Sequence, residues 1–362
     1  MTNLNANARA AASNSTAEHR FSWKWYLSDL AKVQKNGLTV FSCFSCGGGS
    51  SMGYKLAGYD VIGNVEIDPR VMEVYRKNNH PKYPYLMDVR DFLKIPDADL
   101  PEELFHLDIL DGSPPCSVFS TAGEREKGWN KEKVFREGQA KQKLDDLFFY
   151  FIQIAEKLKP RVVIAENVSG LLKGNAKGYV NEIFKAFDAA GYKTQLFLLN
   201  AAFMGVPSAR ERCFFIAGRK DQCFQKLEFH FDEEVILFGE VRSKHGIPLT
   251  GTGIEAKKLL EKRIKTDKCM ADIKQRILKK NSGFTQAIMH DDAVAPALVS
   301  SSNAYRYCDG EKLSEEDCRN IQTFPQDYDF SPESAKYICG MSVPPVMMAQ
   351  VSAEVYNQWL KP

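Results

Sequence analysis

The sequence lacks several features that would assign it to a common class of protein. Its 362 residues contain no apolar run near the ~18 residues of a membrane span, and no apolar segment typical of a secretion signal. The net charge is only +2, so any surface for nucleic acid has to be a local patch. No repeat of solenoid period is present. We therefore expect no membrane partner and no repeat architecture.

Metal-finger spacing is also absent, although the chain has nine cysteines, at positions 43, 46, 116, 213, 223, 269, 308, 318 and 339. Cys43 and Cys46 form one Cys-x-x-Cys, but no second ligand pair follows. We therefore expect no metal site. An odd number of cysteines without a disulfide framework favours reduced thiols in a cytoplasmic protein.

A cysteine on a rigid turn is the most informative feature that is present. Residues 107–110 form a short apolar run typical of a buried strand, and Gly112, Ser113, Pro114 and Pro115 then end both helix and sheet. Cys116 thus follows the carboxyl end of a strand, where open α/β sheets have their ligand crevices. A lone cysteine here is either a small buried apolar residue or a nucleophile.

A glycine-rich turn follows the first predicted strand, residues 38–42. Residues 44–53 are rich in glycine and serine and lead into a helical pattern, an arrangement that brings backbone amides close to a cofactor. A second strand, 61–65, is followed by Glu66, 18 residues after Gly48 and near the ~20 expected of an acid that binds ribose. This predicts a nucleoside-type cofactor. The spacing is not GxGxxG, which argues against a dinucleotide dehydrogenase, and an ordinary glycine turn with a surface acid is the alternative.

Polar residues follow further predicted strands. Asp88 comes after the third strand, Glu166 after the strand at 162–165, and Arg210 and Arg212 before the strand at 213–217. Helical patterns lie at 144–158, 180–187 and 346–360, and another strand at 196–199. A plain ion pair is the alternative to a functional role for Glu166 and Arg212.

Three segments have a structural and a functional interpretation. Residues 21–33, rich in aromatics, predict a helix ending near Asn36 that either caps the core or binds a partner. The charged residues 117–141 are either disordered or a lid over the turn at Cys116. Residues 255–281 hold ten Lys or Arg against four acids, and form either a solvated helix face or a phosphate-contacting surface.

In order and spacing, these elements resemble the cytosine carbon-5 DNA methyltransferases over nearly all of residues 38–360. The matching motifs are Phe44 to Gly49 for the cofactor loop, Pro115-Cys116 for the catalytic Pro-Cys, Glu166-Asn167-Val168 for Glu-Asn-Val, and Arg210-Glu211-Arg212 for Arg-x-Arg. Arg319 with Phe324-Pro325, and Gly340 to Val343, resemble the last two motifs.

The resemblance implies a set of site residues. The implied catalytic residues are Cys116 as nucleophile, Glu166 as acid, and Arg210 and Arg212. The implied residues for S-adenosylmethionine are Phe44, Ser45, Cys46, Gly47, Gly48, Glu66, Ile67, Asp88, Val89, Ser113, Pro115, Leu147, Ser342 and Val343. The resemblance implies no metal.

Four positions depart from the family pattern. Cys46 stands at the first loop glycine and Ser117 at the usual Gln after the nucleophile. Ser208 replaces the Gln before the arginines, and Met341 replaces the Asn of Gly-Asn-Ser-Val. These changes bear on cofactor fit and on the target pocket, but they leave the nucleophile, the acid and Arg212 intact.

We therefore expect an α/β protein with the Rossmann-like S-adenosylmethionine-dependent methyltransferase fold and a small target-recognition domain. The expected divisions are 1–37 as an extension with a capping helix, 38–222 as catalytic domain, 223–325 as target-recognition domain, and 326–362 returning to the catalytic domain.

The expected activity is methyl transfer to carbon 5 of a flipped-out cytosine in a short specific duplex DNA sequence, through a Cys116 adduct. The alternatives are an RNA (tRNA) cytosine methyltransferase and a catalytically silent DNA-binding relative. The expected setting is a monomer in the cytoplasm, associated with the nucleoid, with a separate cognate restriction endonuclease.

Overall fold

The computed structural model describes residues 19–115, 146–172, 177–279 and 286–362. The chain forms two compact units. One, here called the sheet unit, comprises Ser28–Asn200, Glu211–His230 and Met348–Pro362. The other, here called the second unit, comprises Met1–Leu27, Ala201–Arg210 and Phe231–Met347. The chain therefore passes between the two units several times.

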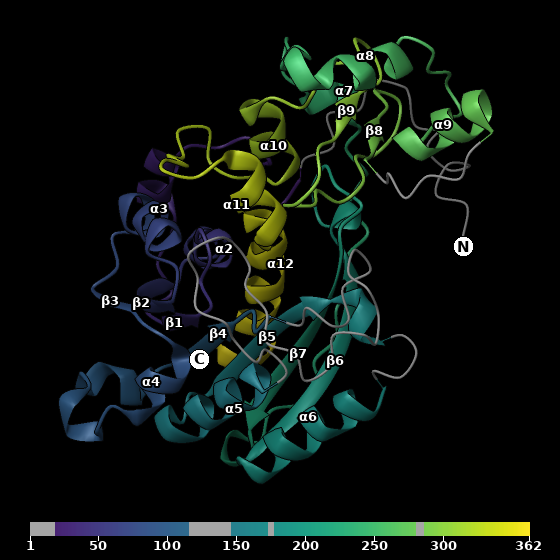
Figure 1. The fold of residues 1–362 in the computed structure, drawn as a ribbon. Coiled ribbons are helices and arrows are strands. Elements are labelled where there is room, and N and C mark those ends of the chain that lie inside the picture. Colours follow the sequence, from purple (N-terminus) through teal and green to yellow (C-terminus); the bar gives the residue numbers. More distant parts are fainter. Residues whose placement is uncertain (1–18, 116–145, 173–176, 280–285) are drawn as a thin grey trace. The chain divides into compact units, whose positions relative to one another are not determined.

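A seven-stranded, mostly parallel sheet organises the sheet unit (Figure 1). Its strands are β1 (Thr39–Cys43), β2 (Asp60–Glu66), β3 (Tyr83–Leu86), β4 (Ile109–Gly112), β5 (Val162–Val168), β6 (Tyr192–Asn200) and β7 (Glu211–Arg219). The order is β3-β2-β1-β4-β5-β7-β6, and only β7 runs antiparallel to its neighbours β5 and β6. The strand order reverses between β1 and β4, where sheets of this type place their ligands. The expected mostly parallel α/β sheet is confirmed.

Helices cover both faces of this sheet. They are α2 (Gly49–Leu56), α3 (Pro69–Asn79), α4 (Val89–Lys94), α5 (Leu147–Leu158), α6 (Lys177–Ala189) and α12 (Pro345–Val355), of which residues 348–355 belong to this unit. Figure 1 shows α5 and α6 side by side across one face. The sequence itself determines where α3 begins. Asp68 caps the helix by accepting from the amides of Arg70 and Val71, and Pro69 occupies the first turn.

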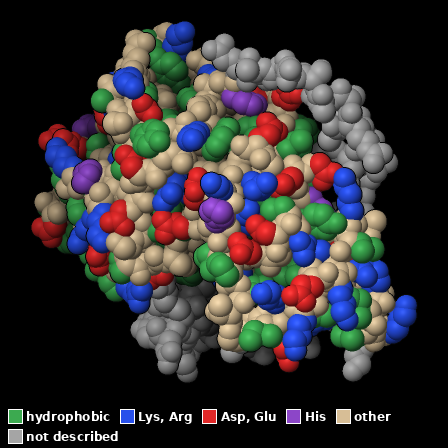
Figure 2. Space-filling view, turned by 90° about the horizontal axis from the view of Figure 1, so that it is seen from above, with side chains coloured by type: hydrophobic (Ala, Val, Ile, Leu, Met, Phe, Trp, Pro, Cys, Tyr) green, Lys and Arg blue, Asp and Glu red, His purple; other side chains and the backbone are tan. Residues whose placement is uncertain are grey.

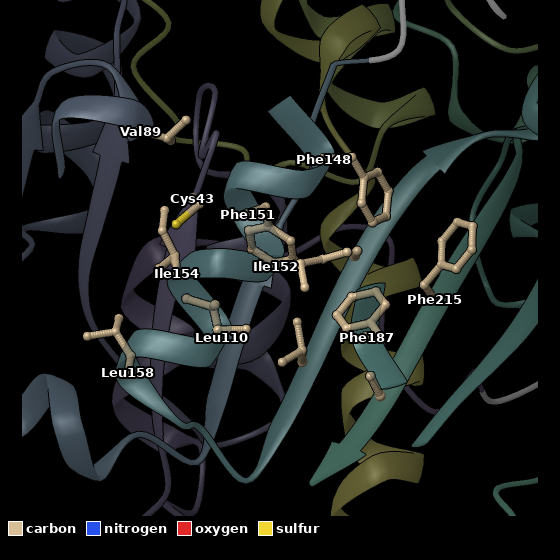
Figure 3. Packing of buried hydrophobic residues seen from close by; sticks show 14 of the residues in the cluster. Cys43, Val89, Leu110, Phe148, Phe151, Ile152, Ile154, Leu158, Phe187 and Phe215 are labelled. Carbon is tan, nitrogen blue, oxygen red and sulfur yellow. The ribbon is translucent and has the colours of Figure 1, made fainter. Parts of the chain in front are cut away.

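Alternation along the strands separates an apolar face from a face that carries polar groups. Figure 3 shows the apolar face, where Leu110 and Phe215 pack with Phe148, Phe151 and Phe187 from the covering helices. The opposite face is covered in part by α2 and the C-terminal helix. It carries buried polar side chains at strand ends, namely Ser42, Asp111 and Glu166.

The second unit contains short helices and a two-stranded sheet. They are α7 (Phe238–Val241), α8 (Ile254–Leu260), α9 (Met270–Leu278), α10 (Glu315–Ile321), α11 (Ala335–Met341), β8 (Ile288–Met289) and β9 (Tyr305–Arg306). Leu249, Leu260, Met270, Ile273, Ile288 and Tyr305 form a small core around α8 and α9. We call residues 249–306 the helical lobe.

The helix expected over residues 21–33 is wrong. Only a 3₁₀ helix, Leu27–Lys32, forms there. Tertiary contacts fix the preceding residues in an irregular path, since the Trp25 indole donates to the carbonyl of Thr323 and the amide of Leu27 donates to Asp327. Trp25 therefore acts as a buried anchor rather than as part of one face of a helix.

The surface carries mixed charge. Figure 2 shows acidic and basic side chains interspersed over the face that it displays, in agreement with the net charge of +2. Within the described part of the chain, no helix is both long enough and apolar enough to cross a bilayer. Because the charges are mixed, binding of a polyanion would depend on individual Lys and Arg side chains that have no acidic partner nearby.

Candidate active site

The loop after β1 has the backbone of a glycine-rich turn even where its residues are not glycine. Phe44, Cys46 and Gly48 have φ values of 53°, 47° and 86°. Residues with a side chain rarely adopt this left-handed conformation, so Cys46 is strained where glycine would not be. The amide of Ser45 donates to Val65 and its hydroxyl accepts from Asn64 at 2.8 Å. The loop is therefore held against the end of β2.

Glu66, at the end of β2, connects this loop to the next strand end. One carboxylate oxygen accepts from the amide of Cys46 at 2.9 Å, and the other accepts from the amides of Ile67 and Asp68. Burial raises the pKa of Glu66, and these three amide donors oppose the rise. The carboxyl is thus fixed between the loop and the residues that follow β2.

Apolar and acidic groups lie together at the ends of β2 and β3. Glu66 and Leu86 are neighbours in the pairing of these strands. Ile67 and Leu86 are 38% and 43% exposed, so both leave apolar surface open to a ligand. Asp88 follows, held by a two-point ion pair with Arg90. Exposed apolar faces next to two carboxyls fit an adenosine, whose ring needs apolar contact and whose hydroxyls need acceptors.

The turn after β4 is set by close packing and by one amide. A Cβ on Gly112 would lie 2.5 Å from the Phe151 ring, so only glycine fits at this strand end. The Asn167 side chain donates to the carbonyl of Pro114 at 3.0 Å. Pro114 is buried, while Ser113 and Pro115 are half-buried. Cys116, the predicted nucleophile, lies outside the described residues, as do Ser117 and the segment 117–141.

Glu166 and Arg212 form a buried ion pair at the same edge of the sheet. The Arg212 Nε lies 2.7 Å from the Glu166 Oε1, and the two side chains are 15% and 9% exposed. The pairing of Val168 with Arg212 on β7 places the guanidinium two residues from Glu166 on the same face. Asn167, next to Glu166, holds the turn that leads to Cys116. An acid and a cation therefore meet where the predicted nucleophile is attached.

Other predicted residues are spread over both units. Val89 begins α4 and Leu147 begins α5, and both are buried in the sheet unit, where Gly47 is part of the loop. Arg210 belongs to the second unit, where its buried guanidinium donates to the carbonyls of Leu298 and Gly340 at 3.1 Å. Ser342 and Val343 follow α11 in that unit and are also buried. The structure thus brings Arg212 to Glu166.

Two residues of this region were not predicted to have a role. Asn167 stands in the Glu-Asn-Val motif, yet its link to Pro114 depends on the pairing of β4 with β5. Asp111 places a carboxyl directly after the apolar residues of its strand. This pattern is the sequence signal by which a role for Asp111 could have been predicted. Within the described ranges, no group of three or more His, Cys, Asp or Glu could hold a metal.

Comparisons with known proteins agree with this geometry. Residues 38–357 match the family model described as C-5 cytosine-specific DNA methylase. The type II methyltransferase M.FnuDI of Fusobacterium nucleatum is 28% identical over 357 residues, covering 89% of this chain and 95% of that protein. The type II methyltransferase M.NgoPII of Neisseria gonorrhoeae is 35% identical over 190 residues, 51% of this chain and 49% of that protein.

A solved structure has the same fold. It is a candidate DNA modification methyltransferase encoded within an E. coli prophage, with a TM-score of 0.64, 18% identity, and coverage of 90% of this chain and 100% of that one. The fold is therefore Rossmann-like, as expected, with the architecture of S-adenosylmethionine-dependent methyltransferases.

Proposed function

Because the chain belongs to the C-5 cytosine-specific DNA methylase family, we propose that it methylates a flipped-out cytosine within a short specific duplex sequence through a covalent Cys116 adduct. The protein is an enzyme, a DNA cytosine-5-methyltransferase. The proposal concerns the residues that carry the reaction and the form of the substrate. The observation that carries it is the buried Glu166–Arg212 pair beside the Asn167–Pro114 hydrogen bond.

The residues that follow β1, β2 and β3 fit S-adenosylmethionine, which supplies the methyl group when it is bound. Glu66 would accept from the ribose hydroxyls, and Asp88 would meet the adenine amine. Ile67 and Leu86 offer the exposed apolar contacts that an adenine ring requires. The backbone of residues 44–48 would hold the methionine portion, with the side chain of Cys46 adding bulk there.

The chemistry requires a nucleophile and two groups that stabilise charge. Carbon 5 of cytosine is a poor nucleophile until a thiolate adds to carbon 6, which is the role of Cys116. Glu166 acts in its protonated form, taking up a proton before the addition and donating it to ring nitrogen 3, while Arg212 holds the ring carbonyl oxygen. After methyl transfer a base removes the proton from carbon 5, and the thiol leaves. None of these contacts is possible within a stacked duplex, so the base must be flipped out.

Arg210 has a different role in this proposal. Its guanidinium is buried and directed at two backbone carbonyls, and this supports a positioning role for the segment that precedes β7. The lid function predicted for residues 117–141 concerns a segment outside the described residues. Ser342 and Val343 would complete the cofactor site.

Target recognition is proposed for residues 223–325, which include the helical lobe. Lys257, Lys258, Lys262 and Lys279 of the lobe are exposed and form no ion pair with any described residue. Such lysines can neutralise DNA phosphates. We further propose a cytoplasmic, nucleoid-associated monomer beside a separate restriction endonuclease, a setting that the type II names of the relatives support.

Radiolabelled S-adenosylmethionine with duplex DNA tests the proposal, with wild type beside Cys116→Ala. Bisulfite sequencing then locates the product. The expected result is label at carbon 5 of cytosine in one short context, absent in the variant. Label in tRNA but not in DNA would favour the RNA enzyme. No label in either, with retained DNA binding, would favour a silent binder.

A further inference from the structure

Asp111 on β4 is a buried carboxyl that none of the proposed steps uses. It is 1% exposed and follows two fully buried apolar residues of its strand, Ile109 and Leu110. The Ser42 hydroxyl donates to one carboxylate oxygen at 2.7 Å, and the Tyr54 hydroxyl donates to the other at 3.2 Å. An ionised group in such a place is costly, so a compact sheet alone gives no reason for a carboxyl there.

The two partners of Asp111 lie on elements that build the cofactor loop. Ser42 is the register partner of Asp111 across β1 and β4, and it lies two residues before Phe44. Tyr54 is on α2, the helix that begins directly after Gly48. Asp111 itself lies three residues before Pro114 on the turn that leads to Cys116. The carboxyl therefore joins both sides of the cofactor loop to the base of the catalytic turn.

We propose that Asp111 is a positioning residue for methyl transfer, which holds the cofactor loop and the catalytic turn at a fixed spacing by binding Ser42 and Tyr54. This inference rests on the proposed function. Methyl transfer requires the methyl group and carbon 5 to meet in a narrow range of distance and angle, and small displacements of the two supporting loops lower the rate strongly.

The ionised form of Asp111 is the one that makes this connection. Both hydroxyls donate to the carboxylate, and bonds to a charged acceptor are stronger than neutral ones. A protonated carboxyl has to donate its own hydrogen to Ser42 or Tyr54, and that hydroxyl must then turn its hydrogen elsewhere. Protonation therefore weakens the link between the loop and the turn.

The titration of Asp111 falls in the neutral range. Burial raises its pKa to about 7, the bonds from Ser42 and Tyr54 oppose the rise, and the charge of Glu166 adds to it. The other groups that face it are Tyr54 on α2, Tyr75 on α3 and Cys43 on β1, each with a pKa raised by burial. These three groups stay neutral between pH 6 and 8 and add no titration there. Burial also raises the pKa of Glu66 in the proposed cofactor site, so the Asp111→Asn variant is needed to separate the two carboxyls.

The experiment measures the dissociation constant of S-adenosylhomocysteine by calorimetry at pH 6 and pH 8. If only the ionised form holds the loop, the wild-type constant is about tenfold larger at pH 6, because the competent fraction falls by that factor. Asp111→Asn keeps the size and does not titrate, but like the protonated carboxyl it must donate to one of the two hydroxyls. We expect its dissociation constant to be the same at both values of pH and close to the wild-type value at pH 6.

Asp108→Asn is the matched control. Asp108 joins the same two strands at their opposite ends, where it accepts from the amide and hydroxyl of Thr39 and pairs with Arg161. We expect it to lower stability but to keep the wild-type pH ratio. Equal wild-type constants at pH 6 and 8, an Asp111→Asn ratio like that of wild type, or loss of the ratio in Asp108→Asn would each overturn the inference. Absence of wild-type binding at any pH would instead contradict the proposed function itself.

Discussion

The acids of the candidate site in the sheet unit and the lysines of the helical lobe hold their charges in opposite ways. In the sheet unit, Glu66, Asp111 and Glu166 lie at strand ends, largely removed from water, and each is fixed by named donors. In the lobe, Lys257 and Lys279 project into solvent without an ion pair to any described residue. Fixed, partly dehydrated charges suit chemistry at one atom, whereas exposed and adaptable charges suit a regular polyanion such as DNA.

The largest effect is expected from Glu166→Gln, which keeps the shape of the side chain but removes the acid. General acid catalysis contributes about 10²–10⁴-fold, so kcat for DNA methylation should fall by that factor while S-adenosylhomocysteine binding is unchanged. Methyl incorporation under saturating conditions measures kcat. Glu211→Gln, at an exposed carboxyl on the neighbouring strand, should retain activity. A fall of less than threefold in Glu166→Gln would contradict the acid role.

An intermediate effect is expected on stability from Asp111→Asn. Because the folded-state pKa is raised to about 7, the fold favours the protonated carboxyl, and stability is lost as pH rises from about 4 to 7. Asparagine removes that loss. The free energy of unfolding of the variant minus that of wild type should therefore be about 2–3 kcal/mol larger at pH 8 than at pH 5. Urea unfolding at the two pH values measures this, and an equal difference at both would refute it.

The smallest effect is expected from Lys279→Glu in the lobe. It should weaken DNA binding several-fold and reduce the slope of log affinity against log salt by about 1, with no change in unfolding. Fluorescence anisotropy over a salt series measures the slope. Lys193→Glu makes the same charge change at an exposed position of the sheet unit that has no ion pair with any described residue, and it should leave the slope unchanged. Identical slopes in both variants would mean that net charge, not the lobe, governs binding. Lys280, in the same basic segment, lies outside the described residues.

Most of the sheet could be predicted because its strands are short apolar runs that end in turn residues. The run at 107–110 became Ile109–Gly112, and the strand expected at 162–165 extends to Val168. The predicted Glu66 and Glu166 lie at carboxyl ends of strands, since parallel strands bring the residues that follow them to one edge. Chemistry-bearing residue types at strand ends were therefore a reliable local signal.

Long-range contacts set the limit of that prediction. The position of β7 between β5 and β6, antiparallel to both, follows from pairing across the sheet and not from any local pattern. The pattern of residues 21–33 resembled a helix. The hydrogen bonds of Trp25 to Thr323 and of Leu27 to Asp327, which fix the observed path, cannot be detected from the local sequence. The hydrogen bonds of Asp111 likewise join residues far apart in the chain. The roles of Arg210, Ser342 and Val343 stay predictions.

The sheet unit is completed by residues 348–362, which come after the whole of the second unit in the chain. These residues are tied to the rest of the unit by hydrogen bonds. The Trp359 indole donates to the carbonyl of Gln225, and the Tyr59 hydroxyl donates to the carbonyl of Ser352. A nascent chain grows from its amino end. A ribosome that has reached residue 347 has therefore produced every predicted catalytic residue but not a finished catalytic unit. The order of synthesis therefore completes the sheet unit only after residues 231–347 of the second unit have been made.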